Sequence, residues 1–315
     1  MSTTVHNDVK KSKQRQRTET INGAARYRTW WMPWLWVGIP IILVFAFYIF
    51  PFINTFVLSF TDADPLSGQG QNVGFQNYID MFRDPMFWNA TFNSVVYALI
   101  VVPLMTLIPL FLAVLVKEWI PGIGLFRSLY YIPAVSSLVV ISLAWRAMLK
   151  DDGVVNNLLH YIGVIEQPVP FLTGRWMLLI SAMLITLWQG IPYYMLMYMA
   201  ALANVDRTLY EAAEVDGAGP IRRFFTVTIP GVRMMMALVA TLVSIGCLKI
   251  FTEVQLLSNG TGGIGGRSET LTMYIRNEGL DPMYGSLGAG SAAAVFLFFM
   301  TVGFIVLSQR LSNDR

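Results

Sequence analysis

Charged residues are scarce in this chain of 315 residues. They make up 13% of it, about half of the ~25% that is usual in soluble globular proteins. Hydrophobic residues make up 55%, and the mean hydropathy is +0.54. A soluble domain needs more charge than this to cover its surface. The composition therefore excludes an ordinary soluble fold and predicts an integral membrane protein.

Cysteine and histidine are nearly absent as well: the chain has Cys247, His6 and His160 and no others. A single cysteine excludes an internal disulfide and a cysteine-based zinc site, and the two histidines lie far apart in the sequence. No G-x-x-x-x-G-K-[ST] sequence, the phosphate-binding loop of many ATPases, occurs. We therefore expect no metal, no cofactor and no enzymatic activity of the chain's own.

Six long apolar segments are present instead. A helix needs about 20 mainly apolar residues to cross a bilayer core. Prolines inside such helices are tolerated because neighbouring groups satisfy the freed backbone carbonyls. The sequence predicts an all-α protein with six transmembrane helices, at residues 34–60, 93–116, 128–149, 176–204, 234–257 and 287–309.

Lysine and arginine are unevenly divided between the two sides that six spans define. Fifteen lie in the tail 1–33, the loops 117–127 and 205–233, and the C-terminus, against five in the opposite loops. Basic loops stay in the cytoplasm, so both termini are predicted there. The basic tail is compatible with nucleic-acid binding, but beside a membrane helix such a run more often sets topology or touches anionic lipid. We therefore expect membrane lipid and not nucleic acid as its partner.

The opposite loops, residues 61–92, 150–175 and 258–286, carry ten acidic and five basic residues. None is large enough for an ordinary folded domain. They are predicted to form a rim on which an external partner docks.

The cytoplasmic loop 205–232 reads as two short helices. Thr208 and Glu211 have the spacing of a capping box, in which each side chain satisfies a backbone N–H of the other end. Gly217 is expected to stop the first helix, because glycine accepts left-handed geometry. The second helix is expected over 221–229, ending at Pro230. Small and apolar residues on the first helix suit insertion into a groove of a partner.

This loop carries a recognisable motif. The runs YEAAEVDGAGP (210–220) and VTIP (227–230) closely resemble the EAA loop of ABC-importer permeases, whose pattern is Glu-Ala-Ala, a later glycine and a hydrophobic-proline close. GFQNY (74–78) and LKIFTEV (248–254) resemble segments of maltose-type sugar permeases. Two features differ: Val205-Asp206 stands where Ile-Pro is common, and the extra spans and large insertion of the maltose subunit are missing. The resemblance, over about 34–310, is to the shorter six-span members.

The resemblance implies a type I ABC-importer permease fold, with residues 34–310 as the permease domain and 311–315 as a cytoplasmic C-terminus. It implies a bacterial inner-membrane location and four kinds of partner: a second permease subunit, two cytoplasmic ATPase subunits that bind the ATP, an external solute-binding protein and a sugar. The EAA loop would be the helix that couples the ATPase to the spans. The resemblance assigns that contact to Glu211, Ala212, Ala213, Asp216 and Gly217.

Polar residues inside the spans are the candidates for a substrate pathway, because they are costly in a bilayer and usually face a cavity or a partner helix. Lys249 and Glu253 are four apart, so they are expected on one helical face, as an ion pair that is either part of the pathway or purely structural.

The run WQGIPYY (188–194) combines an expected helix break, space at a glycine, aromatic faces and an amide. Those features suit a sugar, which stacks on aromatic rings and hydrogen-bonds through its hydroxyls, although simple helix packing explains them too. The pathway candidates here are Gln189, Gly190, Tyr193 and Tyr194. Asn93, Trp145 and Gln255 are weaker candidates, and Arg146 is expected to reach toward the outer interface.

The leading hypothesis is the translocation subunit of an ATP-driven importer for a di- or oligosaccharide. The alternatives are a permease of the same class for glycerol 3-phosphate or another polyol, and an ion-driven secondary transporter. The last predicts more charge buried at mid-membrane and repeated halves, neither of which is evident in the sequence.

Overall fold

The computed structural model describes residues 31–116, 130–281 and 285–313. Within these ranges the chain is helical apart from loops and one isolated antiparallel bridge between Thr61 and Asn72, so the all-α prediction is confirmed. The chain divides into two units, Met1–Asn54 and Thr55–Arg315. The predicted loop 117–127 and almost all of the basic tail lie outside the described residues.

The first unit holds most of one apolar helix. α2 (Met32–Val44) runs into a π-helical turn (Phe45–Ile49) and then into α3 (Phe50–Leu58), whose end belongs to the second unit. Trp34–Leu58 makes an apolar helix of 25 residues, which spans about 37 Å at 1.5 Å per residue. Pro51 lacks an N–H and its ring crowds the carbonyl four residues earlier. The π-helical turn that ends two residues before Pro51 widens the backbone there.

The second unit contains the remaining elements. Their bounds are α4 Gln76–Arg83, α5 Pro85–Leu115, α7 Leu138–Met148, α8 Val154–Tyr161, α9 Arg175–Ala203, α10 Arg207–Val215, α11 Pro220–Arg223, a π-helical turn η2 Phe224–Thr228, α12 Ile229–Leu248, α13 Thr252–Leu257, a 3-10 turn Ile264–Gly266, α14 Leu271–Leu280 and α15 Leu287–Asn313.

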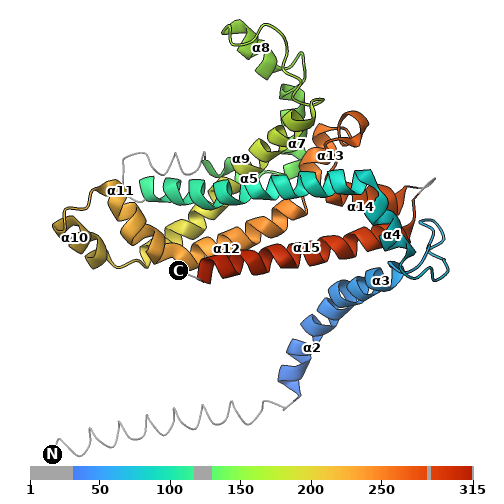
Figure 1. Cartoon of the computed structure of the whole chain (residues 1–315). Helices are drawn as coiled ribbons and strands as arrows, with labels where there is room; N and C mark the ends of the chain where they lie inside the picture. Colours follow the sequence, from blue (N-terminus) through green and yellow to red (C-terminus); the bar gives the residue numbers. More distant parts are fainter. Residues whose placement is uncertain (1–30, 117–129, 282–284, 314–315) are drawn as a thin grey trace, which may run out of the picture. The chain divides into compact units, whose positions relative to one another are not determined.

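Four long helices form the core of this unit. α5 packs on α9 and α12, and α12 packs on α15, so these helices lie side by side in Figure 1. The buried side chains between them include Tyr97, Leu110, Ile185 and Tyr198. α10 and α11 lie at one end of the long helices, and α4, α13 and α14 lie at the other (Figure 1). We call these the α10 end and the α14 end.

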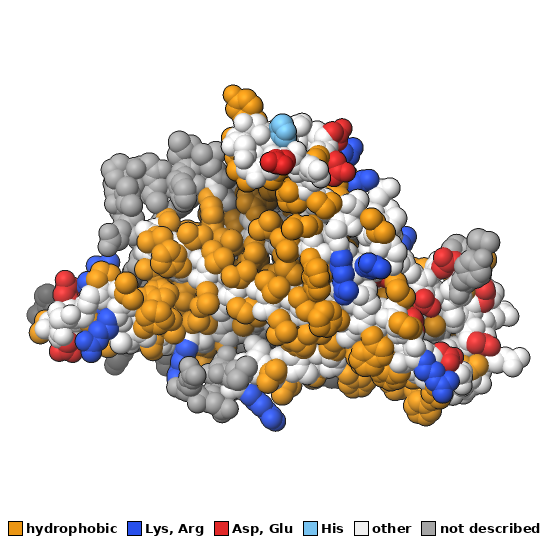
Figure 2. Space-filling model, turned by 45° about the horizontal axis from the view of Figure 1, so that its top comes forward, with side chains coloured by type: hydrophobic (Ala, Val, Ile, Leu, Met, Phe, Trp, Pro, Cys, Tyr) orange, Lys and Arg blue, Asp and Glu red, His pale blue; other side chains and the backbone are white. Residues whose placement is uncertain are grey.

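Within the described residues, helical segments long and apolar enough to cross a membrane correspond to five of the six predicted spans: Trp34–Leu58, Pro85–Leu115, Arg175–Ala203, Pro220–Leu257, which has a short break after Leu248, and Leu287–Arg310. Figure 2 shows a face with a broad hydrophobic middle, as lipid contact requires. The second span begins at Pro85, earlier than predicted. Asp84 caps it by accepting from the Met86 N–H at 2.8 Å, and proline suits the first helical turn.

The third predicted span is not one continuous helix in the described residues. Residues 130–135 are helical, the chain bends at Ser136, and α7 then begins at Leu138. Residues 128 and 129 of the predicted span lie outside the described ranges. The prediction of an uninterrupted span was wrong: Pro133 was expected to be tolerated within the helix, and the helix instead ends two residues after it.

The fifth span also departs from the prediction, at both ends. The second short helix of loop 205–232 does not end at Pro230: α11, the π-helical turn η2 and α12 follow one another without a gap. As at Pro51, the π-helical turn ends two residues before the proline. Toward the α14 end, α12 stops at Leu248 and α13 starts at Thr252, so the predicted span 234–257 is interrupted.

Candidate functional site

A cavity of about 260 Å³ lies between the long helices of the second unit. Its wall comes from α5, the helical residues 130–135, α9, α12 and α13. Five of the six residues predicted for a substrate pathway line it: Gln189, Gly190, Tyr193, Tyr194 and Glu253. The structure therefore places in one cavity candidate residues that lie on two different predicted spans.

The α9 side of the cavity is aromatic. The rings of Tyr193 and Tyr194 meet edge to face with centroids 5.2 Å apart. A Cβ at Gly190 would lie 2.6 Å from the Met105 methyl carbon, so a larger residue here would have to displace the flexible end of the Met105 side chain. The expected helix break in this run is wrong, because α9 continues through Pro192 as a helix.

Gln189 ties α9 to the bend in the third segment. Its Nε2 donates to the Ser136 carbonyl oxygen at 3.2 Å. That carbonyl stands where the helix is interrupted, and a backbone acceptor in a membrane interior is costly unless it is paired. Gln189 therefore has a structural reason to be polar as well as a place in the cavity wall.

Glu253 reaches the cavity from the first turn of α13 and is buried, with 6% of its surface exposed. Its Oε1 accepts from the Thr186 hydroxyl at 2.8 Å, and the Thr186 oxygen lies 2.7 Å from the Tyr97 hydroxyl. Thr186 and Tyr97 were not predicted as site residues. The one available signal was that both are polar residues inside apolar spans.

The predicted ion pair between Lys249 and Glu253 is wrong. α12 ends at Leu248 and α13 starts at Thr252, so the two residues do not share a helical face. Lys249 is exposed and is not among the residues that line the cavity. An ion pair that the structure does show joins Arg223 and Glu214, at 3.1 Å.

The weaker candidates have other surroundings. Asn93 is fully buried and holds the loop before α14: its Nδ2 donates to the carbonyls of Arg267 and Glu269, at 2.9 and 2.7 Å, and its Oδ1 accepts from Arg175 at 3.2 Å. Trp145 packs edge to face on Trp188. Of the remaining two, Gln255 has a buried amide oxygen with no hydrogen bond, and Arg146 donates to Asn259 at 3.0 Å.

The loop that carries Asn93's partners also contains a carboxyl group with an altered acidity. Burial raises the pKa of Glu269 to about 7, and the nearby carboxylates Glu278 and Asp84 act in the same direction. The Asn277 amide, which donates to Glu269 Oε1 at 2.6 Å, opposes the shift. This group lies at the α14 end, outside the long apolar helices.

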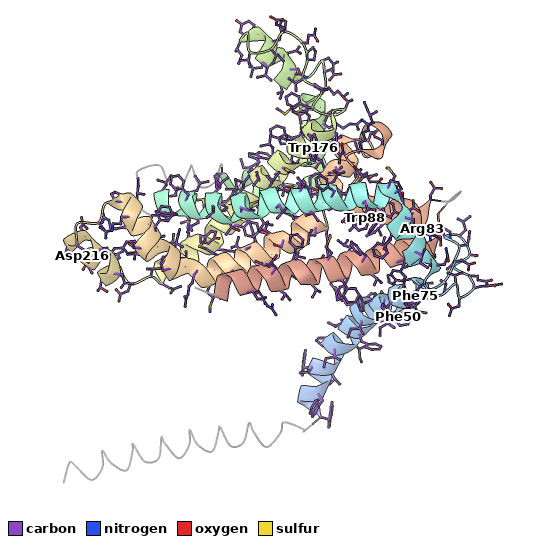
Figure 3. The ribbon with its side chains drawn as sticks, in the orientation of Figure 1. Phe50, Phe75, Arg83, Trp88, Trp176 and Asp216 are labelled. Carbon is purple, nitrogen blue, oxygen red and sulfur yellow. The ribbon has the colours of Figure 1, made fainter. Side chains whose placement is uncertain are left out.

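At the other end of the unit, α10 presents the Glu-Ala-Ala residues. Glu211, Ala212, Asp216 and Gly217 are exposed and Ala213 is half-buried, and Figure 3 shows Asp216 at the end of the unit opposite Trp88 and Trp176. The apolar Leu209 and Val215 are 52% and 88% exposed. A short helix with exposed small and apolar residues is a surface that a partner could cover.

An N-cap hydrogen bond and a glycine backbone angle explain how α10 begins and ends. Asp206, not Thr208, is the N-cap: its carboxylate accepts from the Thr208 N–H at 2.9 Å, which lowers the pKa of Asp206. The predicted capping box is therefore wrong. Gly217 has φ +72°, and the Ala218 N–H donates to the Ala213 carbonyl at 2.9 Å. This is the glycine-terminated end that was predicted.

Long apolar helices, a cavity between them and an exposed helical loop at one end define the class of a multi-pass membrane transport protein. The fold is that of type I ABC-importer permeases. A crystal structure of a bacterial ABC transporter involved in the import of the acidic polysaccharide alginate superposes with a TM-score of 0.77, covering 90% of this chain and 96% of that one at 22% identity. At that identity the likeness shows the fold alone.

The chain belongs to the family described as the binding-protein-dependent transport system inner membrane component, whose model matches residues 82–313. It is 36% identical over 250 residues to the lactose transport system permease protein LacF of Rhizobium radiobacter, covering 78% of this chain and 82% of that one. It is 28% identical to the arabinooligosaccharides transport system permease protein AraP of Bacillus subtilis (strain 168), covering 90% and 88%. The chain is thus an inner-membrane permease, a transport component.

Proposed function

We propose that this chain is the translocation subunit of an ATP-driven importer for a neutral di- or oligosaccharide. The observation that carries the proposal is the cavity, in which two tyrosine rings, an amide and a carboxylate converge. Rings offer flat apolar faces and the polar groups offer hydrogen bonds, the combination that positions a small polar ligand. Relatives named for lactose and arabinooligosaccharides support the same substrate class.

The cavity of one subunit is small for such a solute. Ligand pockets typically measure about 300–1,000 Å³, and this one measures about 260 Å³. A second permease subunit across the same passage would enlarge it, so we propose a pair of permease subunits as the working unit.

The driving force is proposed to enter at α10. Two ATPase subunits, which bind the ATP, would dock on α10 through Glu211, Ala212, Ala213, Asp216 and Gly217. The exposure of these residues supports this, as does the 15-to-5 excess of lysine and arginine on the same side of the predicted topology. Both chain termini would then be cytoplasmic, and an external solute-binding protein would dock at the α14 end.

Glycerol 3-phosphate is the less favoured substrate. Phosphate groups in proteins are usually met by arginine, lysine or backbone N–H groups at helix N-termini. No lysine or arginine is among the described residues that line the cavity, and its one acidic side chain, Glu253, would repel a phosphate.

Uptake of radiolabelled lactose and arabinotriose by cells that express the complete importer tests the proposal. We expect uptake to continue when a protonophore collapses the proton gradient while glycolysis maintains ATP, and to stop when ATP is depleted. Uptake that follows the proton gradient and ignores ATP would instead support the ion-driven secondary transporter. Uptake of glycerol 3-phosphate but of neither neutral sugar would overturn the substrate class.

A further inference from the structure

A chain of three hydrogen-bonding side chains ends at the cavity wall. Tyr97 comes from α5, Thr186 from α9 and Glu253 from α13. The Tyr97 and Thr186 oxygens lie 2.7 Å apart, and the Thr186 oxygen lies 2.8 Å from Glu253 Oε1. Of the three, Thr186 and Glu253 line the cavity, and Tyr97 lies behind them, fully buried.

The hydrogen bonds between these three side chains run in one direction, from donor to acceptor. A carboxylate only accepts, so the single hydroxyl proton of Thr186 is used on Glu253. Thr186 can then only accept from Tyr97, whose hydroxyl proton points toward it. Tyr97 has no exposed surface from which water could satisfy that proton instead. With Glu253 ionised, the order of donation is therefore Tyr97 to Thr186 to Glu253, and each donor holds the next group in one orientation.

The Glu253 carboxylate has acceptor positions that its bond to Thr186 does not use. An ionised carboxylate has about four acceptor positions on its two oxygens, and Thr186 occupies one of them. No lysine or arginine is among the described residues lining the cavity, and Lys249, the nearest basic residue in sequence, is exposed. The carboxylate is therefore suited to accept from hydroxyl donors of a neutral ligand and to disfavour an anionic one.

We propose that Glu253 binds the substrate's hydroxyl groups in the cavity and selects neutral over anionic solutes, and that Thr186 and Tyr97 are positioning residues for its carboxylate. The inference rests on the proposed function, since it needs a solute that passes through this cavity. It adds two residues, Thr186 and Tyr97, that carry no charge and lie on spans different from that of Glu253.

The test compares Glu253→Gln, Thr186→Val, Thr186→Ser and Tyr97→Phe in the complete importer, with uptake of labelled lactose or arabinotriose normalised to assembled transporter. An external binding protein captures solute before the permease does, so the maximal rate should fall while the half-saturating concentration stays unchanged. We expect a fall of about 10-fold or more for Glu253→Gln and Thr186→Val, since a hydrogen bond to a charged group is lost or loosened. Tyr97→Phe should cost a few-fold, about 2 to 5.

Thr186→Ser is the matched control, because it removes a methyl group and keeps the hydroxyl. It should transport within about twofold of the unchanged protein. Equal losses in Thr186→Ser and Thr186→Val, after normalisation, would show that the site needs threonine's shape and would overturn the positioning role. Unchanged maximal rates in Glu253→Gln would overturn the binding role.

A second readout addresses charge selection directly. Equilibrium dialysis of the purified transporter with lactose and with its carboxylate derivative lactobionate should show lactose preferred, and Glu253→Gln should shrink that preference. An unchanged preference contradicts charge selection by Glu253. If the importer without substitutions carries neither lactose nor arabinotriose, the proposed function itself fails. An effect seen only in the variants concerns the roles of Glu253, Thr186 and Tyr97 instead.

Discussion

The C-terminal end of α10 allows a test of ATPase docking, because the backbone angle of one residue determines where this helix ends. Gly217 has φ +72°, and a Cβ added there would meet no atom within 4 Å. Gly217→Ala therefore introduces no clash, and its cost is the left-handed backbone alone, about 1–2 kcal/mol. The helix end relieves this strain by unwinding, which removes the Ala218 N–H bond to Ala213.

If α10 is the surface on which the ATPase docks, the ATPase must restore this end when it binds. A cost of about 1–2 kcal/mol lowers the association constant by about 5- to 30-fold. Titration of the purified ATPase subunit onto the permease complex in nanodiscs measures this directly. Maximal uptake should fall in parallel at limiting ATPase, while the amount of permease in the membrane stays unchanged.

Two further variants make the result interpretable. Gly217→Asn should bind with an affinity between those of glycine and alanine, because asparagine tolerates the left-handed region better than other residues. Gly303→Ala, in α15 with nothing within 4 Å of the added Cβ, should leave ATPase binding unchanged. If Gly217→Ala binds the ATPase as tightly as Gly303→Ala does, α10 is not the docking surface.

Three other predictions follow from the same structure. Asp206→Ala should weaken ATPase binding about threefold and Asp206→Asn should not, because asparagine also caps a helix; the titration described for Gly217 measures both. Gln189→Leu leaves the Ser136 carbonyl without its amide donor, at a cost of about 1 kcal/mol, and should lower the thermal midpoint of the purified permease by about 2–4 °C; an unchanged midpoint contradicts this role of Gln189. Burial raises the pKa of Glu269 to about 7, above its unfolded value, so its contribution to stability is full below about pH 4.5 and is lost as pH rises through about 7. Hydrogen exchange of residues 262–277, corrected for intrinsic rates, should therefore be faster at pH 8 than at pH 6, and Glu269→Gln should remove the difference.

The sequence predicted the parts of this protein that depend on local pattern. Long apolar runs located five of the six spans because length and hydropathy determine which helices can cross a bilayer. The Glu-Ala-Ala run located α10, and the glycine rule placed its end at Gly217 because only the backbone angle of that residue matters there. Even here the cap was misassigned, since Asp206 and Thr208 are both good N-cap residues and only the structure distinguishes them.

What escaped prediction depends on contacts between segments. The three residues between α12 and α13 include no proline or glycine, so Lys249 and Glu253 looked like neighbours on one helix. The bend at Ser136 is stabilised by an amide on α9 that is 53 residues away in sequence. The hydrogen bonds between Tyr97, Thr186 and Glu253 join three helices. The sequence around any one of these residues does not indicate the other two. Five of the proposed pathway residues were nevertheless identified, because polar and aromatic residues are uncommon inside spans unless they face a cavity or a partner.

The most direct measurement of the central claim uses proteoliposomes that contain this chain with its partner permease, with and without the ATPase subunits. With the ATPase, ATP inside the vesicle and the solute-binding protein outside, labelled sugar should accumulate, and ATP hydrolysis should rise when loaded binding protein is added. Without the ATPase, accumulation should be absent under any imposed ion gradient. Accumulation driven by an ion gradient in vesicles that lack the ATPase would contradict the account.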